Sequence, residues 1–281
     1  MTSHAPQREV PGAVSPLTRA VLTGPSRQGL VLASFPTALY LSVGEHHEVL
    51  PVVASDALML PTAARLSAPG RDLVWGVEPG DTVTIDRSGI RMPGWQVRLV
   101  REWRPARVGA VPRLAEPDLL TAVADILSCH VSTPELVHQA TDVFRAARSG
   151  DEAEVRRGAG QLLGAGQGLT PSGDDVLCAV LLVLNGVGDP GPVALLGKAV
   201  QDRWTCTTSL SASLLDAARR GYAVPEVAAL VECALRGDLA GAREALTSTL
   251  AIGHSSGRDL VAGLAGSLRV LAAVQSPIPT R

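Results

Sequence analysis

The stretch Gly164-Ala-Gly-Gln-Gly-Leu-Thr-Pro-Ser-Gly-Asp-Asp175 joins two helix-like segments, and the rest of the chain is best understood from it. It holds four glycines within ten residues, two hydroxyl side chains, and the adjacent carboxylates Asp174 and Asp175. A helical pattern ends just before it, and a strongly apolar segment, Val176 to Leu184, follows. The order therefore predicts a helix, a glycine-rich loop and a helix N-terminus, where free backbone N–H groups suit an anion.

This loop supplies most of the candidate site residues. Asp174 and Asp175 are candidate catalytic residues and candidate ligands of Mg²⁺, which prefers a few carboxylates plus substrate oxygens. The candidate ligand-binding residues in the loop are Gly166, Gly168, Thr170, Ser172 and Gly173. The alternative is a capping box, in which Ser172 and Asp175 satisfy free N–H groups of the helix. That alternative leaves the glycines, Thr170 and the second aspartate unexplained.

Two later stretches repeat this chemistry. Ile252-Gly-His-Ser-Ser-Gly-Arg-Asp259 is another glycine-bounded loop that opens a helix, and we expect it to face the first loop and hold a phosphorylated or carboxylated ligand with it. Its candidates are Ser255, Ser256 and Asp259 as ligand-binding residues and His254 as a catalytic proton carrier. The alternative makes Ser256 and Asp259 a helix cap and leaves His254 in solvent. The hydroxyl-rich run Thr205 to Ser211 adds Thr208 and Ser209, whose hydroxyls either bond an anion or cap a helix.

Composition limits the class of protein. Of 281 residues, 46% are hydrophobic and only 3% aromatic, so a large core filled by Leu, Val and Ala is expected. The net charge of −2 and the lack of a basic, aromatic-rich patch argue against nucleic-acid or membrane partners. The four cysteines show no C-x-x-C spacing, and Cys178 lies in an apolar run, which is typical of a core residue in a reducing compartment. With no signal-peptide pattern and no apolar run of membrane-spanning length, the chain is predicted to be cytoplasmic.

The pattern of the chain changes near its middle. Residues 1–14 are predicted to be a flexible tail, residues 15–112 a β-rich barrel- or sandwich-like domain, and residues 117–275 an all-helical domain that carries the glycine-rich motifs. Strands are predicted at Gly29 to Phe35, Thr37 to Val43, Leu50 to Ala54, Thr82 to Ile85, and Trp95 to Trp103. Helices are predicted to begin at Pro134, after Asp151 and after Asp238, and to run from Pro225 to Gly237 and from Arg258 to Val274. The fold class is therefore α+β.

The motifs also carry a family resemblance. The run Gly166 to Asp175 resembles the signature of the AllH-like family, which includes the AllH subunit of oxamate carbamoyltransferase. The segments Thr207 to Ser211 and Gly253 to Asp259 resemble the two later motifs of that family, although Arg258 stands where the family often has an aromatic residue. The resemblance covers residues 160 to 270. It implies a β-rich part followed by a helical part, with FdrA-like and AllG-like partner subunits.

Three functions remain open at this level. The resemblance implies a subunit of an enzyme that converts oxalurate and phosphate into oxamate and carbamoyl phosphate. The carboxylates alternatively suit a stand-alone Mg²⁺-dependent hydrolase or phosphotransferase. In the third interpretation the glycine loops are packing devices of a non-catalytic assembly subunit. The chain has no P-loop, no strand-linked dinucleotide fingerprint, no G-x-S-x-G elbow and no H-E-x-x-H motif, which argues against those enzyme classes.

Overall fold

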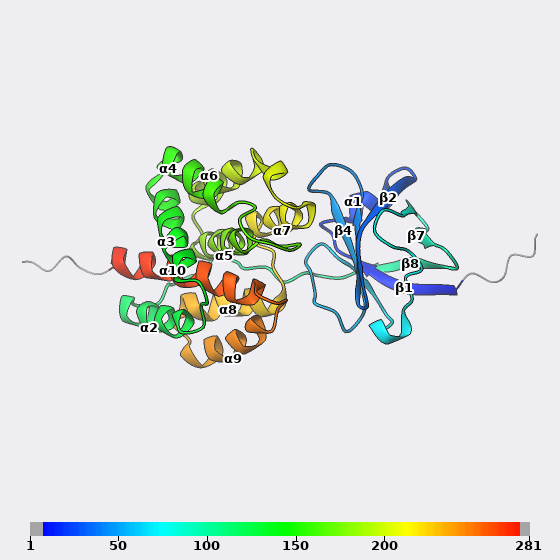
Figure 1. Ribbon diagram of the computed structural model, residues 1–281. Helices are drawn as coiled ribbons and strands as arrows, with labels where there is room; N and C mark the ends of the chain where they lie inside the picture. Colours follow the sequence, from blue (N-terminus) through cyan, green and yellow to red (C-terminus); the bar gives the residue numbers. More distant parts are fainter. Residues whose placement is uncertain (1–7, 276–281) are drawn as a thin grey trace, which may run out of the picture. The chain divides into compact units, whose positions relative to one another are not determined.

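The computed structural model describes residues 8–275, and the described chain divides into two compact units after Pro105. The first unit is a closed β-barrel and the second is helical (Figure 1). The predicted α+β class, with a β-rich part before an all-helical part, is confirmed.

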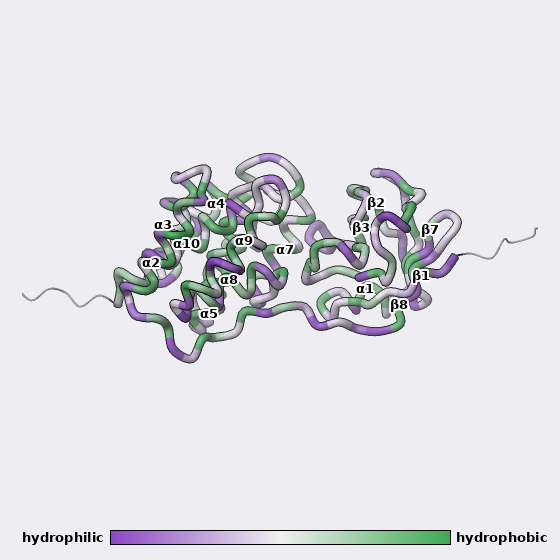
Figure 2. Tube along the Cα trace, turned by 90° about the horizontal axis from the view of Figure 1, so that it is seen from below, coloured by the Kyte–Doolittle hydropathy of each residue, from purple (hydrophilic) through white to green (hydrophobic). Residues whose placement is uncertain are grey.

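The barrel closes in the strand order β1-β5-β4-β3-β2-β6-β7-β8. Its elements are β1 (Arg8–Val14), α1 (Arg19–Thr23), β2 (Arg27–Phe35), β3 (Ala38–Ser42), β4 (Val49–Val53), β5 (Ala64–Leu66), the 3₁₀ turn η1 (Gly70–Asp72), β6 (Thr82–Asp86), β7 (Gly89–Met92) and β8 (Trp95–Glu102). Along β2, buried and accessible residues alternate, as a strand with one face on the barrel core requires. Hydrophilic and hydrophobic residues accordingly follow one another closely along the chain (Figure 2).

The prediction of a flexible tail is wrong for residues 8–14, which form β1; residues 1–7 lie outside the described part of the chain. Strand β1 pairs with β8 in parallel and with β5 in antiparallel register. Pro11 and Gly12 interrupt its sequence pattern, and its partners lie far along the chain, so no local signal identified it. The sequence did not predict the short strands β5 and β7 either, because three or four residues carry too little periodicity.

Nine α-helices make up the helical unit within the described residues. They are α2 (Pro117–Ser128), α3 (Pro134–Ser149), α4 (Glu152–Leu162), α5 (Ser172–Val187), α6 (Pro190–Gln201), α7 (Ser209–Arg219), α8 (Pro225–Arg236), α9 (Leu239–Leu250) and α10 (Ser256–Gln275), with a 3₁₀ turn, η2 (Trp204–Cys206), before α7. The predicted caps are confirmed: Asp151 accepts a hydrogen bond from the Glu154 amide, and Asp238 accepts one from Gly241. Gly237 ends α8 in the left-handed conformation.

Helix α5 is the centre of the helical unit, as its apolar sequence predicts (Figure 1). Every residue from Gly173 to Leu184 is buried, including Cys178, which is confirmed as a core residue. Helix α10 lies directly against it at Gly263, where an added Cβ would lie 2.6 Å from the carbonyl oxygen of Val176. This glycine therefore lets α10 pack directly on the backbone of α5.

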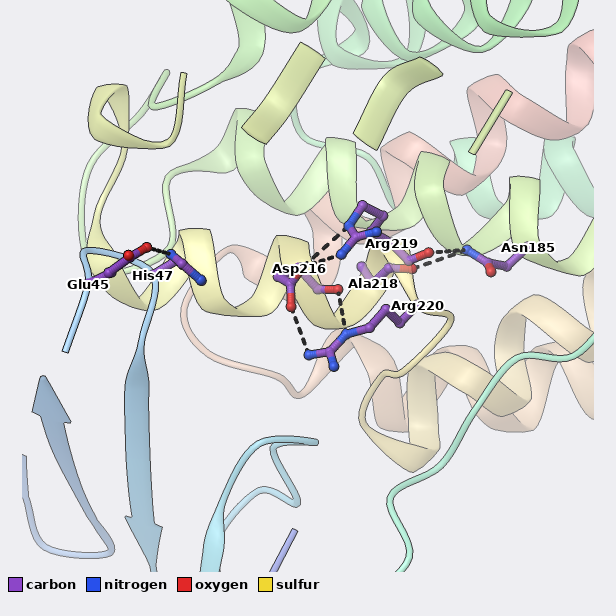
Figure 3. Close-up of polar contacts among 7 residues, drawn as sticks. All are labelled: Glu45, His47, Asn185, Asp216, Ala218, Arg219 and Arg220. Atoms are coloured by element: carbon purple, nitrogen blue, oxygen red, sulfur yellow. Dashed lines mark hydrogen bonds and ion pairs between the residues drawn. The ribbon is translucent and has the colours of Figure 1, made fainter. Parts of the chain in front are cut away.

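A polar clip joins the other end of α5 to α7. The side-chain amide of Asn185 donates to the carbonyl oxygen of Leu181 at 2.8 Å. It also donates to the carbonyl oxygens of Ala218 and Arg219, at 3.2 and 3.3 Å (Figure 3). On α7, Asp216 pairs with both Arg219 and Arg220, at 2.8 and 2.7 Å. The clip adds a side-chain donor to two carbonyls at the end of α7, one of which, that of Ala218, also accepts from the Gly221 amide.

The unit boundary lies at Pro105, earlier than the predicted boundary between 112 and 117. The segment after Pro105 has no helix, but it is bonded to the helical unit. The amide of Val108 donates to the Gly221 carbonyl and that of Val111 to the Gly186 carbonyl, both at 2.8 Å. Proline content alone does not reveal which unit such an extended segment packs on.

Candidate functional site

Three segments that are far apart in the sequence meet around the start of α5. The glycine-rich loop, residues 164–171, contacts the start of α10 through Thr170, whose Oγ1 lies 2.9 Å from Oγ of Ser256. The same loop contacts the start of α7, where the Thr208 hydroxyl donates to the Leu169 carbonyl at 2.5 Å. The segments predicted to converge are therefore neighbours, and we call this region the three-loop cluster.

The glycines of the loop make this close approach feasible. Gly164, Gly166 and Gly168 have φ of 76°, 125° and 91°, a range that side-chain-bearing residues rarely adopt. A Cβ added to Gly164 would lie 2.1 Å from the Cys206 carbonyl oxygen, and one added to Gly173 would lie 2.0 Å from that of Leu162. The four glycines thus serve turn geometry and backbone packing.

Asp174 holds the loop in place. It is 1% exposed, and its two carboxylate oxygens are both engaged: Oδ1 accepts from the Gly164 amide at 2.8 Å, and Oδ2 accepts from the Thr207 hydroxyl. Burial raises the pKa of Asp174, and the hydrogen bonds from Thr207 and Gly164 oppose that rise. Because both of its oxygens already have protein donors, Asp174 is less suited to hold a ligand than its neighbour.

Asp175 has a different environment. It is 6% exposed, and its Oδ2 has no hydrogen-bond partner within the described chain. Burial raises its pKa well above the ordinary value, hydrogen bonding to Ser256 and Thr170 lowers it, and repulsion from Asp259 and Asp174 raises it further. Asp259 is 7% exposed and also has an unpartnered Oδ2 among the described residues. Two buried acceptors on different helices therefore lack donors, which native proteins rarely tolerate without a ligand or water.

The helix N-termini are less available to an anion than the sequence suggested. The amide of Gly173 donates to the Ala165 carbonyl, and those of Asp174 and Asp175 donate to the Pro171 carbonyl. At the start of α10, the Gly257 amide donates to the Ile252 carbonyl. By contrast, the amides of Gly166 and Gly168, in the exposed loop tip, donate no hydrogen bond within the described chain.

The capping-box alternative is wrong for α5, because Pro171 is the N-cap and no side chain makes a capping hydrogen bond there. Ser172 is instead the half-buried first residue of the helix. Thr208 does cap α7, accepting from the Ser211 amide at 3.1 Å, and Ser209 is the first residue of that helix. His254 and Ser255 are exposed on the loop before α10, and Ser256 is half-buried.

Thr207 has a role that the sequence pattern did not reveal. It lies in the hydroxyl-rich run Thr205 to Ser211, one position before the candidates Thr208 and Ser209, and its contact with Asp174 depends on how η2 turns the chain. No group of three or more His, Cys, Asp or Glu residues suited to a metal ion occurs in residues 8–275. Within that part of the chain, no helix combines the length and apolar character that crossing a bilayer requires.

Comparison with known proteins points to one family. No curated protein and no solved structure matches the chain. One family model matches residues 162–268. This segment begins at the last residue of α4 and ends within α10, so it contains all three segments of the three-loop cluster. Over residues 162–268, the chain matches the family model of oxamate carbamoyltransferase subunit AllH, which confirms the resemblance carried by its motifs.

Proposed function

We propose that this chain is a subunit of an oxamate carbamoyltransferase-like enzyme and that the three-loop cluster binds the carbamoyl group. The enzyme would convert oxalurate and phosphate into oxamate and carbamoyl phosphate together with FdrA-like and AllG-like subunits. One observation carries the proposal: the unpartnered Oδ2 atoms of Asp175 and Asp259 lie where the family's motifs meet. A carbamoyl group ends in an NH₂ with two N–H donors, which two such acceptors suit.

Asp175 would also transfer a proton. When a phosphate oxygen attacks the carbamoyl carbon, the C–N bond to oxamate breaks, and the departing nitrogen takes up one proton while the attacking hydrogen phosphate gives one up. A carboxyl group whose pKa is raised by burial keeps its proton closer to neutral pH, which suits a general acid. We assign this relay to Asp175, with His254 on the exposed loop exchanging protons with solvent.

The phosphate would lie at the exposed side of the cluster. The free amides of Gly166 and Gly168, with the hydroxyls of Ser172 and Ser255, offer donors there. Thr170 and Ser256, half-buried and hydrogen-bonded to each other, would connect this phosphate to the buried carboxyl groups. Asp174 is then a positioning residue, because its own oxygens hold the loop.

Reconstitution tests the proposal. The purified chain is mixed with its FdrA-like and AllG-like partners, and carbamoyl phosphate formation from oxalurate is measured. Asp175→Asn and Asp259→Asn are expected to lower kcat by about 100-fold or more, the usual size of a general acid–base contribution. Asp118→Asn, which changes a carboxylate in the first turn of α2, far from the cluster in sequence, is the matched control and should leave the rate unchanged. Full activity without this chain would refute the proposal.

Mg²⁺ at the same carboxylates is the second candidate, favoured by the same unpartnered oxygens. A stand-alone metal-dependent hydrolase or phosphotransferase would then be the function. Millimolar Mg²⁺ would raise the unfolding temperature of the wild-type chain but not of Asp175→Asn, and EDTA would abolish turnover of a phosphorylated substrate by the isolated chain. An unfolding temperature that Mg²⁺ does not change would reject the metal-dependent alternative and leave carbamoyl binding as the only proposal.

A further inference from the structure

The outer face of the barrel carries two arginines on either side of a small residue. Ala13 of β1 pairs with Arg65 of β5 and with Arg101 of β8. Side chains of directly paired residues project from the same face of a sheet, on strands that lie about 4.8 Å apart. Ala64 and Leu66, the sequence neighbours of Arg65, face the barrel core, so Arg65 faces outward.

A β-bulge brings Arg101 into this row. The pairing of β1 with β8 shifts between Gly12 and Ala13, so that Gly12 pairs with Leu99 and Ala13 with Arg101. Val100 is the extra residue and is 52% exposed. Without this bulge Val100 would stand opposite Ala13, and the two arginines would not share a row.

The arginines line a pocket of about 660 Å³ that is formed within the barrel unit. Its lining includes Gly12 and Ala13, and Ala13 pairs with both arginines, so a small side chain lies between the two long ones. Trp103 also lines the pocket, and its indole N–H donates a 2.9 Å hydrogen bond to the Ala63 carbonyl. The Arg65 guanidinium lies 5.3 Å from the centre of the Trp103 ring. This cation–π contact orients the guanidinium and leaves its N–H donors for another partner.

The positive charge in this pocket is not offset. Neither Arg65 nor Arg101 has an ion-pair partner among the described residues, and Arg65 Nε is buried without an acceptor there. The one carboxylate in the pocket lining, Glu102, pairs with Arg19 at 2.7 Å. Arg98 on the same strand shows the ordinary surface alternative, because it pairs with Glu9 at 3.3 Å.

We propose that this pocket is an anion-binding site for the carboxylate or phosphate group of a small molecule, held by Arg65 and Arg101. Guanidinium groups bind such anions through paired, charge-assisted hydrogen bonds. The hydroxyls of Ser55 and Ser67, which also line the pocket, add donors. The proposal depends on the barrel unit alone, so it stands whether or not the three-loop cluster binds a carbamoyl group.

Isothermal titration calorimetry on the full chain tests this site, with inorganic phosphate and oxamate titrated separately to distinguish the two sources of negative charge. We expect at least one of them to bind, and Arg65→Met and Arg101→Met each to weaken its binding by about tenfold or more, the usual effect of losing a charge-assisted bond. Arg98→Met removes the same charge from the same strand and should change affinity less than about twofold.

Two results would overturn the proposal. The first is no binding of either anion by a chain whose thermal unfolding is cooperative. The second is an equal loss of affinity in Arg98→Met, which would indicate a general surface-charge effect. Because Arg101 is exposed, its substitution is not expected to affect folding, so that variant keeps the test decisive if Arg65→Met is unstable.

Discussion

Asp174 and Asp175 are adjacent in the sequence but differ in what surrounds them. Successive residues of an α-helix point about 100° apart, so the two carboxylates face different neighbours. Asp174 accepts hydrogen bonds from the Gly164 amide and the Thr207 hydroxyl, whereas Asp175 interacts with Ser256 and Asp259 at the start of α10. The sequence pattern makes both carboxylates candidates, but it carries no signal for which of them is satisfied and which is left with an unpartnered oxygen.

The raised pKa of Asp175 predicts a pH dependence of stability. Its pKa is about 3.9 in an unfolded chain and higher when folded, so folding favours the protonated form. The stabilising contribution is fully present below pH about 4 and is lost as pH rises through the folded pKa, at about 1.4 kcal/mol for each pH unit between the two pKa values. Asp175→Asn cannot ionise and should be more stable than wild type at pH 7. Urea unfolding between pH 4 and 8 measures this, with Asp118→Asn as control; parallel profiles for all three proteins would contradict it.

Gly173 gives a prediction about packing. Its missing Cβ leaves room for the Leu162 carbonyl, which an added methyl group would approach to 2.0 Å. Backbone atoms cannot move aside cheaply, so Gly173→Ala should lower the free energy of unfolding by about 2 to 3 kcal/mol. Gly191 is also the second residue of its helix, but a Cβ added there would lie no closer than 3.5 Å to its nearest neighbour. Gly191→Ala should therefore change the free energy of unfolding by less than about 0.5 kcal/mol. Equal effects in denaturant unfolding would disprove this explanation.

At the scale of elements, helix starts and stops were predictable because their signals are local. Asp151, Asp238 and Gly237 act within one turn of the helix they bound. Strand β1 was not predictable, since its identity comes from pairing with β8, which lies far along the chain. The row formed by Arg65 and Arg101 is invisible in the sequence for the same reason: it exists only when the barrel closes and the bulge sets the register.

The Asn185 clip predicts how tightly α5 and α7 are joined. Asn185→Ala would leave the Arg219 carbonyl without this donor, while the Ala218 carbonyl would keep the Gly221 amide, and an unsatisfied carbonyl costs about 1 to 3 kcal/mol in a half-buried site. Thr247→Ala, which removes an exposed hydroxyl that bonds within its own helix, is the control and should cost much less. Unfolding curves of the two variants make the comparison, and a cost as small as that of Thr247→Ala would show that the clip adds nothing.

At the scale of the whole molecule, each unit has its own core. The barrel core is one cluster of buried side chains drawn mostly from its strands, and the helical unit surrounds α5. Each unit is large enough to bury a core by itself. The three-loop cluster belongs to the helical unit and the arginine pocket to the barrel, so each chemical feature is built without residues of the other unit.

The extended segment after Pro105 decides where the helical unit begins. Fragment 106–281 keeps Val108 and Val111, which are 1% and 8% exposed and whose amides bond to Gly221 and Gly186. Fragment 117–281 starts at the boundary predicted from the sequence and loses both. Burying a valine contributes about 1.5 to 3 kcal/mol, so the longer fragment should be more stable by about 3 kcal/mol or more. Urea unfolding of the two fragments decides, with Val108→Ala in the longer one expected to lose part of the difference. Equal stability would mean that residues 106–116 belong to neither core, and the boundary at Pro105 would be wrong.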